Sequence, residues 1–241
     1  MRFATRSLSA LALTVLGACS SITDPGDPLA RRVPRPPKPI ILFVHGWNAN
    51  ASTWNTMIGR FKRDGWQASE LVAFSYNYTV SNATTAGIIA QKVDSLRSAN
   101  SVAQVAIVTH SMGALSARYY VRNLGGDGKV AALVSLGGTN HGTTTAQFCF
   151  QTSCQEMWPN SSFTTNLNAD DESWGTPRYA TWWSPCDEVI NPDASAQLSG
   201  GAVNNQTACI SHSQLHEDAT VYAGVREWVT QPVSAIVVAA R

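Results

Sequence analysis

Charge is scarce in this chain, and it is unevenly placed. Only 14% of the 241 residues are charged, and the formal net charge is +1. From Ile40 onward 11 Lys and Arg residues stand against 14 Asp and Glu residues, a net charge of −3. A domain with this balance lacks the basic surface that a phosphate backbone requires, so we expect no nucleic acid among its partners.

Long apolar runs are also missing. The apolar stretch at residues 7–16 (SLSALALTVL) is too short to span a bilayer as a helix, and it follows two arginines, as an export signal does. Its end, residues 16–19 (LGAC), resembles a bacterial lipoprotein signal, in which the Cys becomes the lipidated first residue. We therefore expect residues 1–18 to be a signal peptide and Cys19 to carry lipid. Ordinary cleavage nearby, with Cys19 incidental, is the alternative.

Proline is sparse outside one segment. Residues 23–39 hold six of the eleven prolines and few apolar residues, which is typical of an extended, semi-rigid tether. The sequence thus predicts a signal peptide, a tether at 19–39 and a catalytic domain at 40–241. We expect a monomer that is exported, either as a cell-envelope lipoprotein in contact with the membrane through its lipid or as a secreted protein.

Cysteine spacings typical of zinc sites are absent, since the chain has no C-x2-C pair. Besides Cys19 there are four cysteines: Cys149, Cys154, Cys186 and Cys209. An even set in an exported chain indicates two disulfides, for which three connectivities are possible.

Apolar strands and amphipathic helices alternate from Ile40 onward. We expect strands at 40–44, 68–74, 105–109, 131–136, 178–183 and 206–210, and helices from Ser52 or Thr53 to Gly65 and at 84–98, 112–124 and 218–229. Such alternation predicts an α/β fold with a mostly parallel sheet flanked by helices. Residues 137–177 break the pattern and read as a long irregular excursion, which in a compact domain is often functional.

The strongest chemical signal is residues 105–115 (VAIVTHSMGAL), where a buried strand runs straight into a helix. Ser111 lies on the turn between them, a place that strains its backbone and presents its hydroxyl above the sheet edge. Such a crowded turn needs small residues two positions before and two positions after the serine. Gly113 meets this need, whereas Thr109 stands at the other position, where Gly is usual. We interpret Ser111 as a nucleophile, and the alternative is an ordinary capping serine.

A second signal, residues 43–47 (FVHGW), directly follows the first buried strand. In this architecture the loop after that strand supplies one oxyanion donor, and the residue after the nucleophile supplies the other. We assign the donors to the backbone N–H groups of Trp47 and Met112. His45 is expected to orient the loop rather than to take part in the chemistry.

Together FVHGW, THSMGA, SLGGTNHGT, TWWSPCDEVI and ISHSQL resemble the bacterial α/β-hydrolase lipases of the actinobacterial and small Bacillus type, over roughly residues 40–230. The resemblance implies an α/β-hydrolase fold without a large lid domain. It also implies triacylglycerol lipase or esterase activity on an ester or lipid substrate, and a Ser-Asp-His triad in that chain order.

The acid and the base should lie on loops that follow late strands. Asp187 follows the strand at 178–183 and matches the family's SPCDEV, so we take it as the acid ahead of its neighbour Glu188. Rivals further along or before the strand are Asp193, Asp170 and Asp171. His212 follows the last strand and has the family's spacing to Leu215, so it is preferred as the base over His216, which we expect to be exposed.

The disulfides fit this layout. A Cys186–Cys209 bridge would tie the loop of the acid to the loop of the base, and Cys149–Cys154 would close a small ring inside the long excursion.

The predicted reaction is two-step acyl transfer through an acyl-enzyme, which needs no metal and no cofactor. An acyltransferase or a polyester hydrolase on the same fold is one alternative. A catalytically silent envelope lipoprotein is another.

Overall fold

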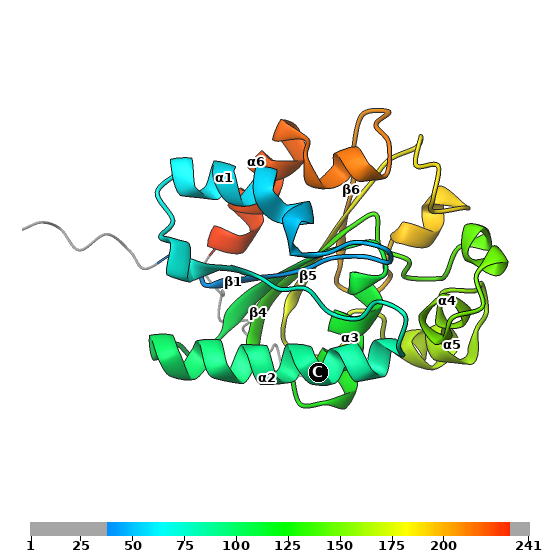
Figure 1. Cartoon of the computed structure of the whole chain (residues 1–241), viewed down its shortest axis with the longest axis horizontal. Coiled ribbons are helices and arrows are strands. Elements are labelled where there is room, and N and C mark those ends of the chain that lie inside the picture. Colours follow the sequence, from blue (N-terminus) through cyan, green and yellow to red (C-terminus); the bar gives the residue numbers. More distant parts are fainter. Residues whose placement is uncertain (1–37, 232–241) are drawn as a thin grey trace, which may run out of the picture. The chain divides into compact units, whose positions relative to one another are not determined.

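The computed structural model describes residues 38–231 (Figure 1). The predicted signal peptide, Cys19 and all but the last two residues of the predicted tether lie outside this range. Among helices between residues 38 and 231, none is long and apolar enough to cross a membrane.

Six parallel strands form one sheet in the order β2-β1-β3-β4-β5-β6. They are β1 (Ile41–Val44), β2 (Leu71–Ala73), β3 (Val105–His110), β4 (Val130–Leu136), β5 (Arg178–Trp183) and β6 (Val203–Gln206). The predicted α/β architecture with a mostly parallel sheet is confirmed, and every strand pair in the described part of the chain is parallel.

Two layers of helices cover the sheet (Figure 1). One face packs against α1 (Asn55–Arg63) and α6 (Ala219–Thr230), and the other against α2 (Asn82–Asn100) and α3 (Gly113–Asn123). Neighbouring strand residues point to opposite faces, so Phe43 joins the apolar layer under α1 and α6 while Leu42 joins the other. A strand buried on both faces must be apolar throughout, which explains the unbroken run at residues 40–44.

The helix starts follow from side-chain caps. Asn50, not Ser52 or Thr53, opens the first helical segment: its side chain accepts the N–H of Ser52 at 2.8 Å, a 3-10 turn runs over Ala51–Trp54, and α1 follows. The second helix begins two residues before the predicted start because Ser81 caps it, accepting the N–H of Ala83 at 3.1 Å.

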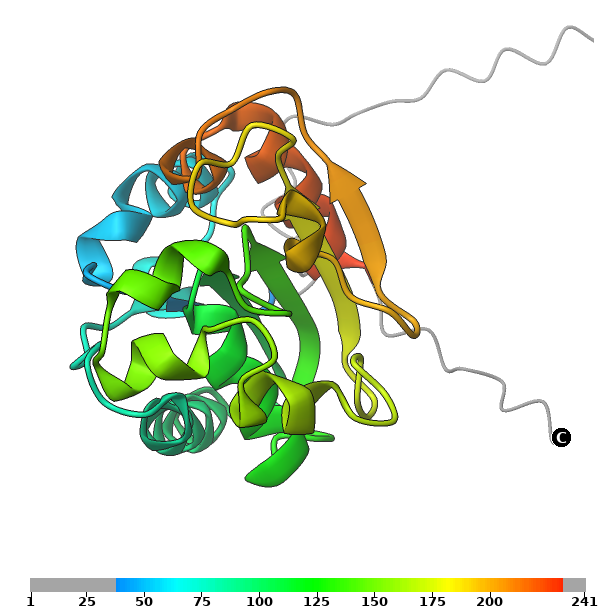
Figure 2. The ribbon, with the colours of Figure 1, turned by 90° about the vertical axis from the view of Figure 1, so that its right-hand side faces the viewer.

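Two predictions about the second half of the chain are wrong in detail. Residues 137–177 are not simply irregular, since they contain a 3-10 turn at Thr144–Phe148 and the short helices α4 (Thr152–Glu156) and α5 (Ser162–Asn168). The last strand is β6 at Val203–Gln206, not residues 206–210. Its sequence, VNNQ, is polar because it lies at the sheet edge, largely in contact with solvent (Figure 2).

The strand order brings the loops after β1 and β3 together. The chain leaves β1 through α1 on one face and leaves β3 through α3 on the other, and β1 and β3 are direct neighbours. At such a switch point the two loops diverge above the carboxyl edge of the sheet and leave a crevice where ligands bind in parallel α/β folds. Residues 45–50 and Ser111 lie there.

Candidate active site

Ser111 occupies a strained turn between β3 and α3. Its φ of 55° lies in the left-handed region, which is unfavourable for a non-glycine residue and persists only where the surroundings enforce it. Its N–H donates to the carbonyl of Leu136 at 2.9 Å, which ties the turn to the end of β4. The turn thus holds the serine above the sheet edge, as the sequence motif predicted.

Close backbone packing encloses this turn. A Cβ on Gly113 would lie 2.6 Å from the carbonyl oxygen of His45 and 2.7 Å from that of Val44. A Cβ on Gly46 would lie 2.7 Å from the Cβ of Ser111. Glycine is therefore required on both sides, because the loop after β1 presses directly against the serine turn.

Thr109, which stands where glycine is usual, does not crowd the turn. Its side chain is buried, and Oγ1 donates to the carbonyl of Val134 in the neighbouring strand at 2.9 Å. The departure from the usual pattern is thus absorbed within the sheet.

Asp187 and His212 form a buried pair beside the serine. Asp187 comes from the loop after β5 and His212 from the segment after β6, and His212 Nδ1 lies 2.8 Å from Asp187 Oδ2. The second carboxylate oxygen, Oδ1, accepts the N–H groups of Val189 and Ile190, each at 2.9 Å. The carboxylate is thereby fixed in one orientation, with one oxygen turned to the imidazole.

The rival acids have other partners. Glu188 accepts the backbone N–H of His212 at 3.0 Å, so it contacts the main chain of this residue and not its ring. Asp170 pairs with Arg122 at 3.4 Å, and Asp171 accepts the N–H of Ser173 at 2.8 Å.

His110 is a member of the site that the sequence analysis left without a role. Its Nε2 lies 3.1 Å from the carbonyl oxygen of His212, and the ring centroids are 4.5 Å apart. Burial, and after it the neighbouring His212 and His216, hold the pKa of His110 well below its usual value. A neutral ring that bonds a carbonyl through Nε2 carries its proton there, so His110 donates and fixes the backbone of His212.

His216 is buried, contrary to the expected exposed position. Its ring packs 4.7 Å from that of His110 and 6.1 Å from that of Trp54, measured between centroids, because the 3-10 turn at Ser213–His216 folds it inward. Burial lowers its pKa as well. No carboxylate in the described part of the chain bonds its ring, which distinguishes it from His212.

His45 orients the loop after β1. Its ring stacks on Tyr76 with the centroids 4.0 Å apart, its Nδ1 lies 2.8 Å from the carbonyl of Gly46, and its own carbonyl accepts the hydroxyl of Tyr76 at 2.5 Å. Burial, as the largest cause, lowers its pKa. This arrangement shapes the path of the chain into Trp47.

The two expected oxyanion donors have free N–H groups. Between residues 38 and 231 no acceptor bonds the backbone N–H of Trp47 or that of Met112. Met112 directly precedes α3, so its N–H also lies at the positive end of that helix dipole.

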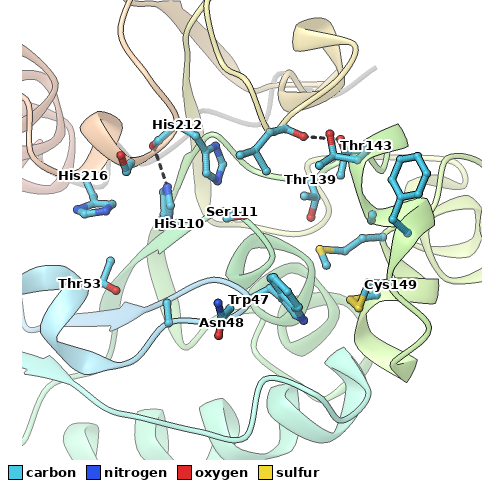
Figure 3. Close-up of a pocket in the computed structure, with 18 residues that line it drawn as sticks. Trp47, Asn48, Thr53, His110, Ser111, Thr139, Thr143, Cys149, His212 and His216 are labelled. Atoms are coloured by element: carbon cyan, nitrogen blue, oxygen red, sulfur yellow. Dashed lines mark hydrogen bonds between the residues drawn. A yellow bond between two sulfur atoms is a disulfide. The ribbon is translucent and has the colours of Figure 1, made fainter.

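A pocket of about 530 Å³ opens over Ser111. Figure 3 shows His110, Ser111 and His212 in the middle of its wall, with Trp47 and Asn48 below them in this view. Much of the remaining wall comes from the excursion at 137–177, through Thr139, Thr143, Thr145, Ala146, Phe148, Cys149, Cys154 and Met157. The long excursion at 137–177 thus forms a large part of the pocket wall.

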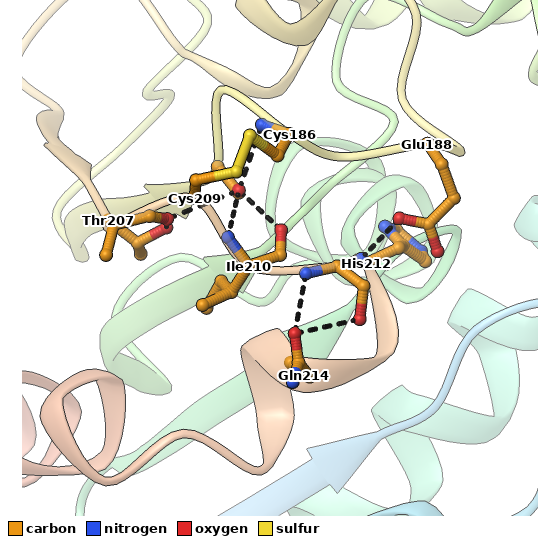
Figure 4. Close-up of a disulfide and its surroundings, with 10 residues drawn as sticks. Cys186, Glu188, Thr207, Cys209, Ile210, His212 and Gln214 are labelled. Atoms are coloured by element: carbon orange, nitrogen blue, oxygen red, sulfur yellow. Dashed lines mark hydrogen bonds between the residues drawn. A yellow bond between two sulfur atoms is a disulfide. The ribbon is translucent and has the colours of Figure 1, made fainter.

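Both disulfides are present, Cys149–Cys154 and Cys186–Cys209. Figure 4 shows the second beside His212 and Glu188. Next to it the Ser184 hydroxyl donates to the carbonyl of Ile210 at 2.5 Å, so bridge and hydrogen bond together join the two loops. Disulfides persist in oxidising compartments, which indicates an exported protein.

One glycine of the site was not predicted, although it lies within the stretch SLGGTNHGT. Gly137 follows β4 with φ of 52°, and a Cβ there would lie 3.0 Å from His212 Nδ1 and 3.1 Å from Asp187 Oδ2. The second Gly of the pair at 137–138 was the available hint, since a doubled glycine after a strand is typical of close backbone approach.

Metal-ligating side chains do not gather anywhere in the described chain: no group of three His, Cys, Asp or Glu residues is placed to hold an ion. In the acidic run at 170–172, Glu172 bonds His141 Nε2 at 2.8 Å and the N–H of Ser199 at 2.5 Å.

The fold defines the class: this is an α/β hydrolase. The sequence model of the family Lipase (class 2) matches residues 37–228, and the chain belongs to that family. It is accordingly a carboxylic ester hydrolase of the lipase and esterase kind.

Solved structures share the fold at low sequence identity. The chain is similar to mature Bacillus licheniformis lipase BlEst2, with a TM-score of 0.72 and 15% identity over 83% of this chain and 95% of that one. It is similar to Aspergillus fumigatus lipase B with a TM-score of 0.69 and 16% identity, over 80% of this chain and 53% of that one. It is similar to phospholipase PlaB from Legionella pneumophila with a TM-score of 0.63 and 16% identity, over 81% of this chain and 60% of that one.

Proposed function

We propose that this protein hydrolyses carboxylic esters through an acyl-enzyme on Ser111, with His212 as the base and Asp187 as the acid of the triad. The observation that carries the proposal is one arrangement. Ser111 is held at φ of 55° in the wall of a pocket that also contains His212, whose Nδ1 is 2.8 Å from a buried carboxylate. Strain at a serine and a paired imidazole beside it are what nucleophilic catalysis requires.

In the first step His212 Nε2 takes the proton of the Ser111 hydroxyl as the oxygen attacks the ester carbonyl. The C–O bond to the alcohol then breaks, and the alcohol leaves with that proton. In the second step His212 takes a proton from water, the resulting hydroxide attacks the acyl-enzyme, and the proton returns to Ser111 as the acid is released. Asp187 keeps the proton of the imidazole on Nδ1 and stabilises the imidazolium.

The tetrahedral intermediates carry an oxyanion, and we assign its donors to the N–H groups of Trp47 and Met112. Both are free of internal acceptors in residues 38–231, and preorganised donors of this kind stabilise a developing charge without reorganisation. The rest of the pocket wall is mainly apolar, with Ala146, Met157 and Val189, which suits the acyl chain of an ester or lipid.

The disulfides support export, and we further propose that the mature protein begins at a lipidated Cys19, with membrane contact through that lipid. The signal-like residues 7–16 motivate this, and so does the fifth cysteine that is left over when the other four pair with one another. Mass spectrometry of the N-terminal peptide tests it: an unmodified N-terminus downstream of Cys19 would contradict the lipid anchor and leave the catalytic proposal standing.

Substitution of the triad tests the catalytic proposal. Ser111→Ala and His212→Ala should each lower kcat/KM for a soluble p-nitrophenyl ester by about 10³-fold or more, because each removes a group that acts in the transition state. His216→Ala is the matched control, since it removes a buried imidazole from the same pocket that no carboxylate orients, and it should cost far less. Circular dichroism must show that each variant is folded. A folded Ser111→Ala protein with near-parental activity, or a greater loss at His216 than at His212, would contradict the assignment.

A further inference from the structure

Two phenylalanines stand in solvent, and one of them, Phe148, lines the mouth of the pocket. Phe148 is 88% exposed and Phe150 is 75% exposed, which makes them the most exposed large apolar side chains between residues 38 and 231. A single exposed apolar residue needs no explanation, but two such aromatic residues on either side of one cysteine form a local patch.

The backbone that bears these rings is held in place. Cys149 between them is bonded to Cys154, which is buried in an apolar cluster with Ala146 and Met157. The side chain of Gln155 donates to the carbonyl of Phe150 at 3.1 Å. One side of this segment is therefore anchored in the core, and the other side faces solvent. The disulfide closes the backbone into a small loop, and this loop holds the two aromatic side chains in solvent.

The patch is continuous with the candidate active site. Phe148 lines the same pocket as Ser111 while remaining exposed. Trp47, 39% exposed, lies on the same rim, where its Nε1 donates to the side chain of Gln151 at 2.8 Å. Figure 3 shows Trp47 and Cys149 at the same end of the pocket. We call Trp47, Phe148 and Phe150 the aromatic rim.

The surroundings of the aromatic rim carry almost no charge. Residues 142–155 and residues 46–59 contain no Asp, Glu, Lys or Arg. The charged residue directly after the first range, Glu156, is partly buried, and its carboxylate accepts hydrogen bonds from Ser81 and Asn82. A surface built for anionic lipid would display Lys or Arg here, because each contributes to attraction by a negative membrane. An aromatic, uncharged rim instead suits an uncharged or zwitterionic surface.

We propose that the aromatic rim docks this hydrolase on uncharged or zwitterionic lipid surfaces, with the pocket mouth facing the lipid. The docking itself is independent of the proposed triad, whereas its benefit for catalysis rests on the proposed function. A protein partner is disfavoured by size. Each aromatic side chain buries at most about 250 Å² and Trp47 is only 39% exposed, so the aromatic rim offers less than the about 800 Å² that a stable protein interface needs from each partner.

Hydrogen–deuterium exchange with phosphatidylcholine vesicles tests the docking, using the full chain with Ser111→Ala so that no ester is turned over. Vesicles should slow exchange of the amides at 148–151 by about threefold or more, and Phe148→Ser/Phe150→Ser should abolish that protection. Leu124→Ser/Val203→Ser is the matched control, because it removes two exposed apolar residues that do not line the pocket, one directly after α3 and one at the start of β6. It should leave the protection unchanged. The readout is local, so binding through the N-terminal segment cannot imitate it.

Activity provides the second arm, in the chain with Ser111 intact. Phe150→Ser, which changes a residue of the aromatic rim outside the pocket lining, should lower hydrolysis of an emulsified triglyceride about threefold or more and leave hydrolysis of a soluble p-nitrophenyl ester within about twofold. Equal loss on both substrates, no vesicle protection at 148–151, or protection that appears only when phosphatidylserine is added would overturn the proposal. Protection without hydrolysis of either substrate would instead refute the proposed function alone.

Discussion

At the scale of single residues, the site depends as much on missing side chains as on reactive ones. Gly46 and Gly113 let the loop after β1 lie against the turn of Ser111, and Gly137 does the same for the Asp187–His212 pair. The motif around the serine predicted Gly113, whereas Gly46 was given no role of its own. Gly137 could not be assigned because its need for glycine comes from two loops that are distant in sequence.

Gly113→Ala should damage both stability and activity. Its Cβ would fall 2.6 Å from one backbone carbonyl oxygen and 2.7 Å from another, and backbone cannot move aside as a flexible side chain can. Gly87→Ala is the matched control, since it lies inside α2 with nothing within 4 Å of an added Cβ. It should stabilise the protein by up to about 1 kcal/mol through helix propensity. Thermal unfolding and ester hydrolysis measure both effects. Equal stability of the two variants would contradict the packing described here.

The histidines show where residue-level prediction stops. Placement after the predicted last strand and the spacing to Leu215 favoured His212, and its Nδ1 lies 2.8 Å from Asp187 Oδ2. The burial of His216 was missed because it depends on Trp54, far away in the sequence, and on the inward fold of a 3-10 turn. His110 was not assigned a role from the sequence, since its bond to the carbonyl of His212 is a tertiary contact.

At the scale of elements, the strongly apolar strands and the amphipathic helices were predictable, and the polar ones were not. Strands buried on both faces can be recognised by their largely apolar composition, as β1 and β3 can. The edge strand β6 has no apolar alternation, so its position was misjudged by a few residues. The short helices α4 and α5 are too brief for a periodic signal, and they are held by a disulfide and by packing.

The Cys186–Cys209 bridge joins the loops that hold Asp187 and His212. Replacing both cysteines with Ser should lower stability by about 3 kcal/mol on the chain-entropy estimate. It should also lower kcat for a soluble ester more than KM rises, because the relative position of the acid and the base is loosened. Cys149→Ser/Cys154→Ser is the comparison: its shorter loop should cost about 2 kcal/mol. Denaturant unfolding and steady-state kinetics provide the readouts. An unchanged kcat in Cys186→Ser/Cys209→Ser would show that the bridge does not position the pair.

At the scale of the whole molecule, buried histidines make stability sensitive to mild acid. Burial lowers the pKa values of His45, His110 and His216, so the unfolded chain binds protons at a pH where the folded chain keeps these rings neutral. Unfolding therefore takes up protons, and stability falls as the pH falls through the unfolded value of about 6.5.

The expected result is a Tm that decreases from pH 7 to pH 5. His110→Gln, which keeps a donor for the carbonyl of His212, should reduce proton uptake on unfolding at pH 5 by about one. Scanning calorimetry over this range measures both quantities. The same proton uptake in His110→Gln would show that His110 is protonated in the folded protein, and a Tm that stays level between pH 7 and pH 5 would contradict the neutral state of the three buried rings.

The central claim concerns the whole site: Ser111 is an activated nucleophile. Labelling of the native protein with a fluorophosphonate, followed by peptide mass spectrometry, tests it most directly, because the probe phosphonylates an activated serine without requiring the natural substrate. The account predicts a single adduct on the peptide that contains Ser111, none in Ser111→Ala, and strongly slowed labelling in His212→Ala. An adduct on another serine, or no adduct in a folded protein that hydrolyses esters, would contradict it.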